Sequence, residues 1–216
     1  MFKSKFKRFG GEYIPDIIEY LRDYIEKEPG VTISVGCDSI QKRRRTLYAM
    51  AIMMYNTDIK RGAHVVFFRE SSPKIKDNNE RLYKEAQYAH DLGVYLDEEL
   101  SKFYTRKDLS DVERKRYKYH LLKCQGEYSN VIPHQEEAVM NALFLTPIDL
   151  MEPRCVDIHV DFNPFAGSVN EKGGIKNKSF TAYKSFVPWL KGMGFRVWAK
   201  PMSHCASTAA DLLLQD

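Results

Sequence analysis

The sequence has no long apolar run, no clustered cysteines and no leader-like N-terminus. No stretch approaches the roughly 18 consecutive apolar residues that span a membrane, so no membrane partner is expected. The first residues, MFKSKFKRFGGEY, are basic but lack the apolar core and cleavage site of a signal peptide. The four cysteines lie far apart without CxxC spacing, which favours reduced thiols over a disulfide framework or a compact zinc site. These absences indicate a cytoplasmic protein.

The remaining composition is typical of a globular protein with one substantial core. The 216 residues are 44% hydrophobic and 29% charged, which predicts a single domain over residues 1–216. No internal repeat, low-complexity segment or Pro/Ser-rich linker marks a domain boundary. A formal net charge of +4 weakly favours a polyanionic partner such as nucleic acid.

Hydrophobic periodicity predicts an α/β fold with a mixed sheet. An N-terminal arm and helix (residues 1–30) precede three β-like runs joined by short turns, which indicates consecutive antiparallel hairpins. Strands and helices then alternate along the chain. The expected strands are 31–38, 46–56, 62–70, 154–163 and 195–200, and the expected helices that follow the hairpins are 77–101, 108–123, 133–145, 179–194 and 204–214.

Two expected strands each carry an aspartate on the polar face near their C-terminal end. The alternation of apolar and polar residues places Asp38 there in 31–38 and Asp161 in 154–163. Ligands usually bind at this end of the strands in open α/β sheets. If the strands are neighbours, the two carboxylates face one volume and repel each other unless a divalent cation lies between them. For either residue alone, a role in capping a turn is the alternative.

Two further acids lie on expected helices. Glu85 falls inside the apolar stripe of helix 77–101, at a position where a leucine would be expected. The alternative is an exposed ion pair with Arg81, four residues earlier on the same helix. Asp211 shares a face of the last helix with His204, and periodicity equally allows an exposed residue at this position.

Four short segments carry these acids: ISVGCDS, ERLYKEA, DIHVDFN and GMGFRVWAKPMSHCASTAAD. Over residues 31–100 and 154–214 they resemble the YkuK-like family of ribonuclease H-like proteins from bacteria and phages. The resemblance implies a ribonuclease H-like mixed five-stranded sheet flanked by helices, with residues 101–153 as a helical insertion that compact members lack. It also implies an acidic metal-binding set made of Asp38, Glu85, Asp161 and Asp211.

The chemistry that the resemblance implies is hydrolysis of phosphodiester bonds in RNA, RNA–DNA hybrid or structured DNA. Two Mg²⁺ or Mn²⁺ ions would bind at the scissile phosphate. Asp38 would bridge the ions, with Asp161 and Glu85 on one side. Asp211 would bind on the other side, and His204 would transfer protons near neutral pH. Expected supporting residues are Ser39, Asn163 and Ser207, which orient the ligands, and Lys42, Arg43, Arg44, Arg45 and Lys200, which bind nucleic-acid phosphates.

Other functional classes share this fold. A DEDD-type 3′–5′ exonuclease normally carries Asp-x-Glu on the first strand, where this chain has Ile40. An actin-like ATPase requires glycine-rich phosphate loops, and GCDSIQKRRR has no second glycine. A non-catalytic module that binds nucleic acid or protein remains the main alternative. In that case the basic residues 42–45 would be a solvated turn and His204 an ordinary residue at a helix start.

Overall fold

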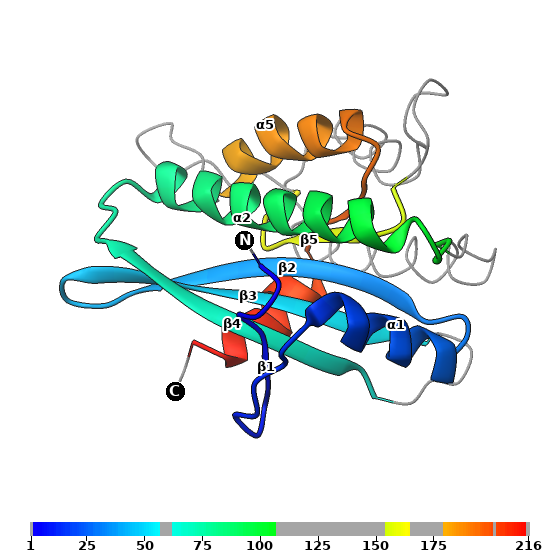
Figure 1. Cartoon of the computed structure of the whole chain (residues 1–216). Coiled ribbons are helices and arrows are strands. Elements are labelled where there is room, and N and C mark those ends of the chain that lie inside the picture. The colour runs from blue at the N-terminus through cyan, green and yellow to red at the C-terminus, as the bar shows by residue number, and fades with distance from the viewer. Residues whose placement is uncertain (1, 57–61, 107–153, 165–178, 201, 215–216) are drawn as a thin grey trace.

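The centre of the molecule is a six-stranded mixed sheet (Figure 1). The computed structural model describes residues 2–56, 62–106, 154–164, 179–200 and 202–214. The strand order is β1-β4-β3-β2-β5-β6. The strands are β1 (Lys7–Arg8), β2 (Thr32–Gln41), β3 (Arg45–Tyr55), β4 (His64–Pro73), β5 (Asp157–Val160) and β6 (Arg196–Trp198). Strands β2, β3 and β4 form consecutive antiparallel hairpins, and β5 and β6 run parallel to β2.

The sixth strand, β1, has no counterpart among the five expected strands. It pairs with β4 through Lys7↔Phe67 and Arg8↔Val66 at the edge of the sheet. Two residues cannot display an alternating pattern, so the sequence gives no local signal for this strand. The other five strands keep the expected chain order of three hairpin strands followed by two parallel ones.

Helices pack on both faces of the sheet. The helices α1 (Ile17–Lys27), α2 (Asn78–Leu100) and α5 (Ser179–Gly192) share one large apolar core with the first face. The C-terminal helix η1 (Cys205–Ala210), red in Figure 1, packs against the opposite face in a smaller core. None of the described helices is long and apolar enough to cross a bilayer.

Helix α2 positions one of the expected acids because its start is fixed by a side-chain cap. The Asp77 carboxylate accepts a hydrogen bond from the Glu80 backbone N–H at 2.8 Å, which satisfies one of the free donors of the first turn. The buried stripe of the helix then faces the sheet, as its spacing predicts. That stripe comprises Leu82, Glu85, Ala86, Ala89, Leu92, Gly93, Leu96, Asp97 and Leu100.

Helix η1 approaches the sheet closely because β2 has a glycine beneath it. A Cβ atom on Gly36 would lie 2.6 Å from the backbone nitrogen of Ala206 and 2.8 Å from the carbonyl carbon of Cys205. No other residue allows the two backbones to lie so close together. Residues 205–210 form a π-helix rather than the α-helix expected over 204–214, and such wide turns are frequent at functional sites.

Several expected boundaries differ from those observed. Strand β2 continues three residues past Asp38, because its pairing with β3 extends to Gln41↔Thr46. Strand β5 is shorter than the expected 154–163, because its pairing with β2 covers only four residues. Most of the expected insertion, with the helices predicted at 108–123 and 133–145, lies outside the described residues.

Candidate active site

Strands β2 and β5 part at Asp38 and Asp161. The last paired residues of these two parallel strands are Cys37 and Val160, so the next residue of each strand is an aspartate. Asp38 remains paired with Ala49 of β3, whereas β5 ends at Val160. The register of the sheet therefore brings the two aspartates next to each other at the point where the strands separate. We call this point the β2–β5 fork.

The Asp38 carboxyl is partly buried and lies near other negative charges. Burial has the largest effect and, with the nearby carboxylates of Asp161 and Asp211, raises the pKa of Asp38 to about 6. The backbone N–H of Ser39 donates to Asp38 Oδ1 at 2.7 Å and opposes this rise. Because the carboxylates of Asp161 and Asp211 both raise the pKa of Asp38, these three of the four expected acids interact electrostatically at one site.

Glu85 reaches the same region from α2. Its side chain is 3% exposed, and Arg81 Nη1 donates to its Oε1 at 2.9 Å. The Ser39 hydroxyl also donates to Oε1, and it accepts a hydrogen bond from Arg81 at 2.7 Å. Burial, followed by the charge of Asp38, raises the pKa of Glu85 to about 8. The ion pair considered as an alternative therefore exists, but on the buried side of the helix.

Asp161 pairs with a cation from the segment that follows β6. Lys200 Nζ lies 2.9 Å from Asp161 Oδ2, and the Lys200 backbone N–H donates to the carbonyl of Phe162 at 3.0 Å. This backbone contact holds Lys200 beside the end of β5. The side chain expected to bind a substrate phosphate thus lies against one of the expected metal ligands.

The C-terminal helix contributes the remaining expected residues. Asp211 follows η1 directly and is partly buried, whereas His204 precedes it and is exposed. The Cys205 backbone N–H donates to Nδ1 of the buried His159 of β5 at 3.1 Å, which places the start of η1 against that strand. The Ser207 hydroxyl donates to the carbonyl of Ser203, just before the helix, at 3.0 Å.

The acids offer carboxylate oxygens that suit a hard divalent cation, but they are not gathered around one position. Glu85 Oε2 and Asp161 Oδ1 are buried and have no hydrogen-bond partner in the described part of the chain, and carboxylate oxygens are the ligands that Mg²⁺ and Mn²⁺ prefer. Among the described residues, no three His, Cys, Asp or Glu side chains lie close enough together to hold one ion. Instead, Arg81 and Lys200 supply positive charge to these two carboxylates. The donor types fit a metal centre, and the chain's own cations currently balance their charge.

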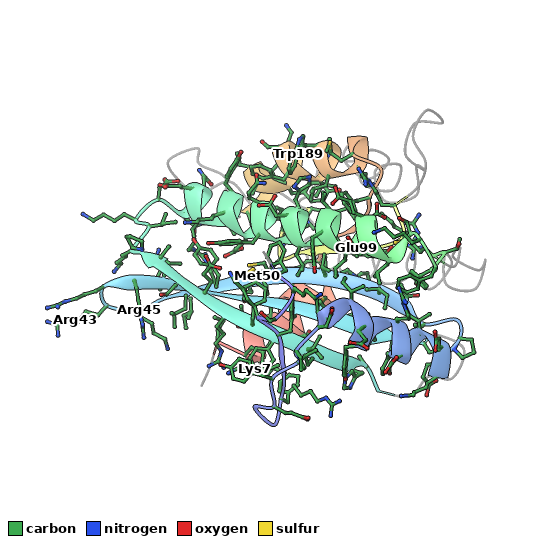
Figure 2. The ribbon with its side chains drawn as sticks, viewed as in Figure 1. Lys7, Arg43, Arg45, Met50, Glu99 and Trp189 are labelled. Carbon is green, nitrogen blue, oxygen red and sulfur yellow. The ribbon has the colours of Figure 1, made fainter. Side chains whose placement is uncertain are left out.

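The other expected contacts lie around this centre. The Asn163 backbone N–H donates to the Ser179 hydroxyl at 3.0 Å, which ties the end of β5 to the start of α5. Residues 42–45 are exposed at the β2–β3 turn, and Figure 2 shows Arg43 and Arg45 at the far end of that hairpin. The fork and the basic turn therefore share strand β2, which pairs with β5 before Asp38 and with β3 as far as Gln41.

Sequence reasoning missed the connection between strand and helix at this site. Arg81 donates to the Ser39 carbonyl at 3.0 Å as well as to its hydroxyl and to Glu85. The spacing of Arg81 and Glu85 identified the pair, and Ser39 was expected to orient the acids, but no sequence signal indicated that Ser39 would bind both members of this pair. Lys200 was identifiable as a cation near the site, although its pairing with Asp161 depends on the β5–β6 register.

Comparison with known proteins agrees with this architecture. Residues 14–115 match the family model described as Ribonuclease H-like. The match covers slightly less than half of the chain and includes Asp38 and Glu85, whereas Asp161 and Asp211 lie beyond it. No curated protein and no solved structure matches the chain. The matched segment is similar to the ribonuclease H-like family, and the six-stranded mixed sheet flanked by helices is consistent with a ribonuclease H-like fold.

Proposed function

We propose that the protein is a divalent-metal-dependent nuclease of the YkuK-like type that hydrolyses phosphodiester bonds in nucleic acid. The observation that carries this proposal is the pair of buried carboxylate oxygens without hydrogen-bond partners, one on Glu85 and one on Asp161 at the β2–β5 fork. A buried polar atom without a partner is destabilising. Binding a cation at this place would remove that cost.

The residues that would hold the metal are Asp38, Glu85, Asp161 and Asp211. Bound Mg²⁺ or Mn²⁺ would supply an activated water and would stabilise the leaving 3′-oxygen. Raised carboxyl pKa values at Asp38 and Glu85 support the assignment, because closely spaced acids with unfavourable ionisation are typical of functional sites.

The remaining roles fall to side chains near the acids. Ser39 and Arg81 orient Glu85 through the hydrogen bonds between β2 and α2. Lys200 would leave Asp161 and bind a non-bridging phosphate oxygen of the substrate, because the phosphate and the Asp161 carboxylate are both anions that pair with its ammonium group. His204, exposed at the start of η1, would accept or return a proton near neutral pH.

A cleavage panel tests this function directly. Labelled RNA–DNA hybrid, single-stranded RNA, duplex DNA and branched DNA are incubated with the protein in Mg²⁺ or Mn²⁺. Wild type should cleave at least one substrate, and Asp161→Asn should lower the rate by a factor on the order of 100 or more, because a ligand is lost while the side-chain shape is kept. The matched control is Glu99→Gln, which removes an acid near the far end of α2.

The alternative is a nucleic-acid-binding module without catalysis. It is favoured by the two ion pairs at the site, because Arg81 and Lys200 already balance the charges of Glu85 and Asp161. Cleavage of no substrate by wild type, combined with metal-independent binding, would replace the nuclease proposal with this one.

A further inference from the structure

The tip of the β2–β3 hairpin and the loop after β4 form one basic surface. The tip comprises residues 42–45 (Lys-Arg-Arg-Arg), and the loop comprises residues 74–76 (Lys-Ile-Lys). Gln41 Nε2 donates to the Ile75 carbonyl at 2.7 Å, and the Ile75 backbone N–H donates to Thr46 Oγ1 at 3.1 Å. These two bonds join the loop to Gln41 and Thr46, the last strand pair before the hairpin turn. We call residues 42–45 and 74–76 together the basic arm.

The basic arm carries six positive charges that nothing in the fold requires. All six side chains are exposed, and in the described part of the chain none of them forms an ion pair. Residues 39–46 and 71–76 contain no acid. The nearest acid in sequence, Asp77, is engaged as the cap of α2. Like charges held together repel one another, so the arm suits a polyanion and contributes nothing evident to folding.

The distance between the basic arm and the β2–β5 fork determines how far from the scissile bond the arm would contact a bound nucleic acid. Strand β2 continues from Asp38 to Gln41, and Arg43 lies two residues further in the turn, which corresponds to at most about 16 Å at roughly 3.3 Å per residue. Figure 2 shows Arg43 and Arg45 projecting from the end of the hairpin. Along a duplex this distance covers about five base pairs, since each strand carries one phosphate per 3.4 Å.

We propose that the basic arm binds the phosphate backbone about five nucleotides from the scissile bond. The preferred substrate is therefore a long polynucleotide that is cut internally, and short oligonucleotides are poor substrates. This inference rests on the proposed nuclease function for the position of the scissile bond. It adds Lys74 and Lys76 to the cations that contact substrate.

The first experiment measures how salt affects binding. The probe is a fluorescent RNA–DNA hybrid of about 24 base pairs, and all proteins carry Asp161→Asn to prevent cleavage. Two arm variants are compared, Arg43→Ser/Arg44→Ser and Lys74→Ser/Lys76→Ser. Each should reduce the slope of log Kd against log salt by about 2 and weaken binding about tenfold or more at low salt, because two phosphate contacts are lost.

The control for this experiment removes the same charge elsewhere. Lys27→Ser/Lys102→Ser changes two exposed lysines, the last residue of α1 and the second residue after α2. The C-terminal ends of these helices lie away from the tip of the β2–β3 hairpin (Figure 1). This variant should keep the wild-type slope. Equal slopes for the arm variants and the control would overturn the proposal.

The second experiment maps cleavage along the hybrid. Wild type should cut interior positions at least about tenfold faster than positions within roughly five base pairs of the end, because only interior cuts engage the arm. The arm variants should lose this preference by slowing interior cuts alone. An unchanged preference in those variants would contradict the length requirement.

The two proposals fail separately. A difference in salt slope without cleavage of any substrate would overturn the nuclease function and leave the arm as a phosphate-binding surface. Cleavage with identical slopes in all variants would leave the nuclease function and overturn the role of the arm.

Discussion

Single residues at the β2–β5 fork are held by different kinds of neighbour. Asp38 accepts a backbone N–H, Glu85 accepts from a hydroxyl and a guanidinium, and Asp161 pairs with an ammonium. Ser39 takes part in the first two of these contacts, since its backbone bonds one acid and its side chain bonds another. A single small residue thus couples the interior strand β2 to α2, which packs on the face of the sheet.

Another residue, Lys191 in the last turn of α5, is half-buried, and its Nζ atom is buried. Its Nζ has no hydrogen-bond partner in the described part of the chain, and burial lowers the pKa of Lys191 from 10.5 to about 8. Below pH 8 both the folded and unfolded states carry the charge, so the folded state bears the full desolvation cost. Between pH 8 and 10.5 the folded state releases its proton first, so the unfolding free energy rises with pH.

We predict that Lys191→Met raises the unfolding free energy near pH 7 by an amount on the order of 1–3 kcal/mol, because one pKa unit corresponds to about 1.4 kcal/mol. This gain in unfolding free energy should shrink toward pH 10.5, because the wild-type protein then no longer buries a charged ammonium group at Lys191. Urea unfolding at several pH values measures both effects. Lys184→Met, which changes an exposed lysine of the same helix, should show neither. A gain that is independent of pH would contradict this account.

At the scale of elements, the alternation of side chains was the most informative sequence signal. It predicted the mixed α/β sheet and the faces of β2 and β5, because each strand needs one apolar face against the α2 core. It did not predict β1, whose two residues are too few to show a pattern. Nor did it indicate the π-helix of η1, whose backbone lies close to β2 at Gly36.

The position of η1 depends on this close packing. We predict that Gly36→Ala moves η1 away from β2, because the added methyl group would lie 2.6 Å from the Ala206 nitrogen. The expected cost is about 1–3 kcal/mol in unfolding free energy. Displacement of Asp211 should also abolish most of any stabilisation by Mn²⁺, which thermal unfolding with and without the metal measures.

Gly93→Ala provides the matched comparison. Its added Cβ would meet Ile158 Cδ1 and Phe195 Cε1 at 3.2 Å, on the α2 side of the sheet. This variant should lose stability but keep the metal response. If Gly36→Ala also kept the full response, η1 would not position a metal ligand.

At the scale of the whole molecule, metal binding should appear as stability. A cation that binds only the folded state at about 100 times its Kd adds about 2.7 kcal/mol, which corresponds to a Tm increase of several degrees for a chain of this size. We predict such an increase with Mn²⁺ for wild type and its loss in Asp38→Asn. Asp23→Asn, an exposed acid on α1, is the control. No increase in wild type would exclude the proposed metal centre without any assay of cleavage.

The order of the proposed ligands along the chain has a consequence for synthesis. Chains fold from their N-terminal segments while translation continues, so β2, β3, β4 and α2 can assemble with Asp38 and Glu85 long before Asp211 has been made. Only when η1 packs against Gly36 would the fourth acid join the β2–β5 fork. If the proposed metal centre exists, a nascent chain would therefore present the basic arm before the proposed ligand set is complete, and the arm would bind nucleic acid earlier in synthesis than the centre could bind metal.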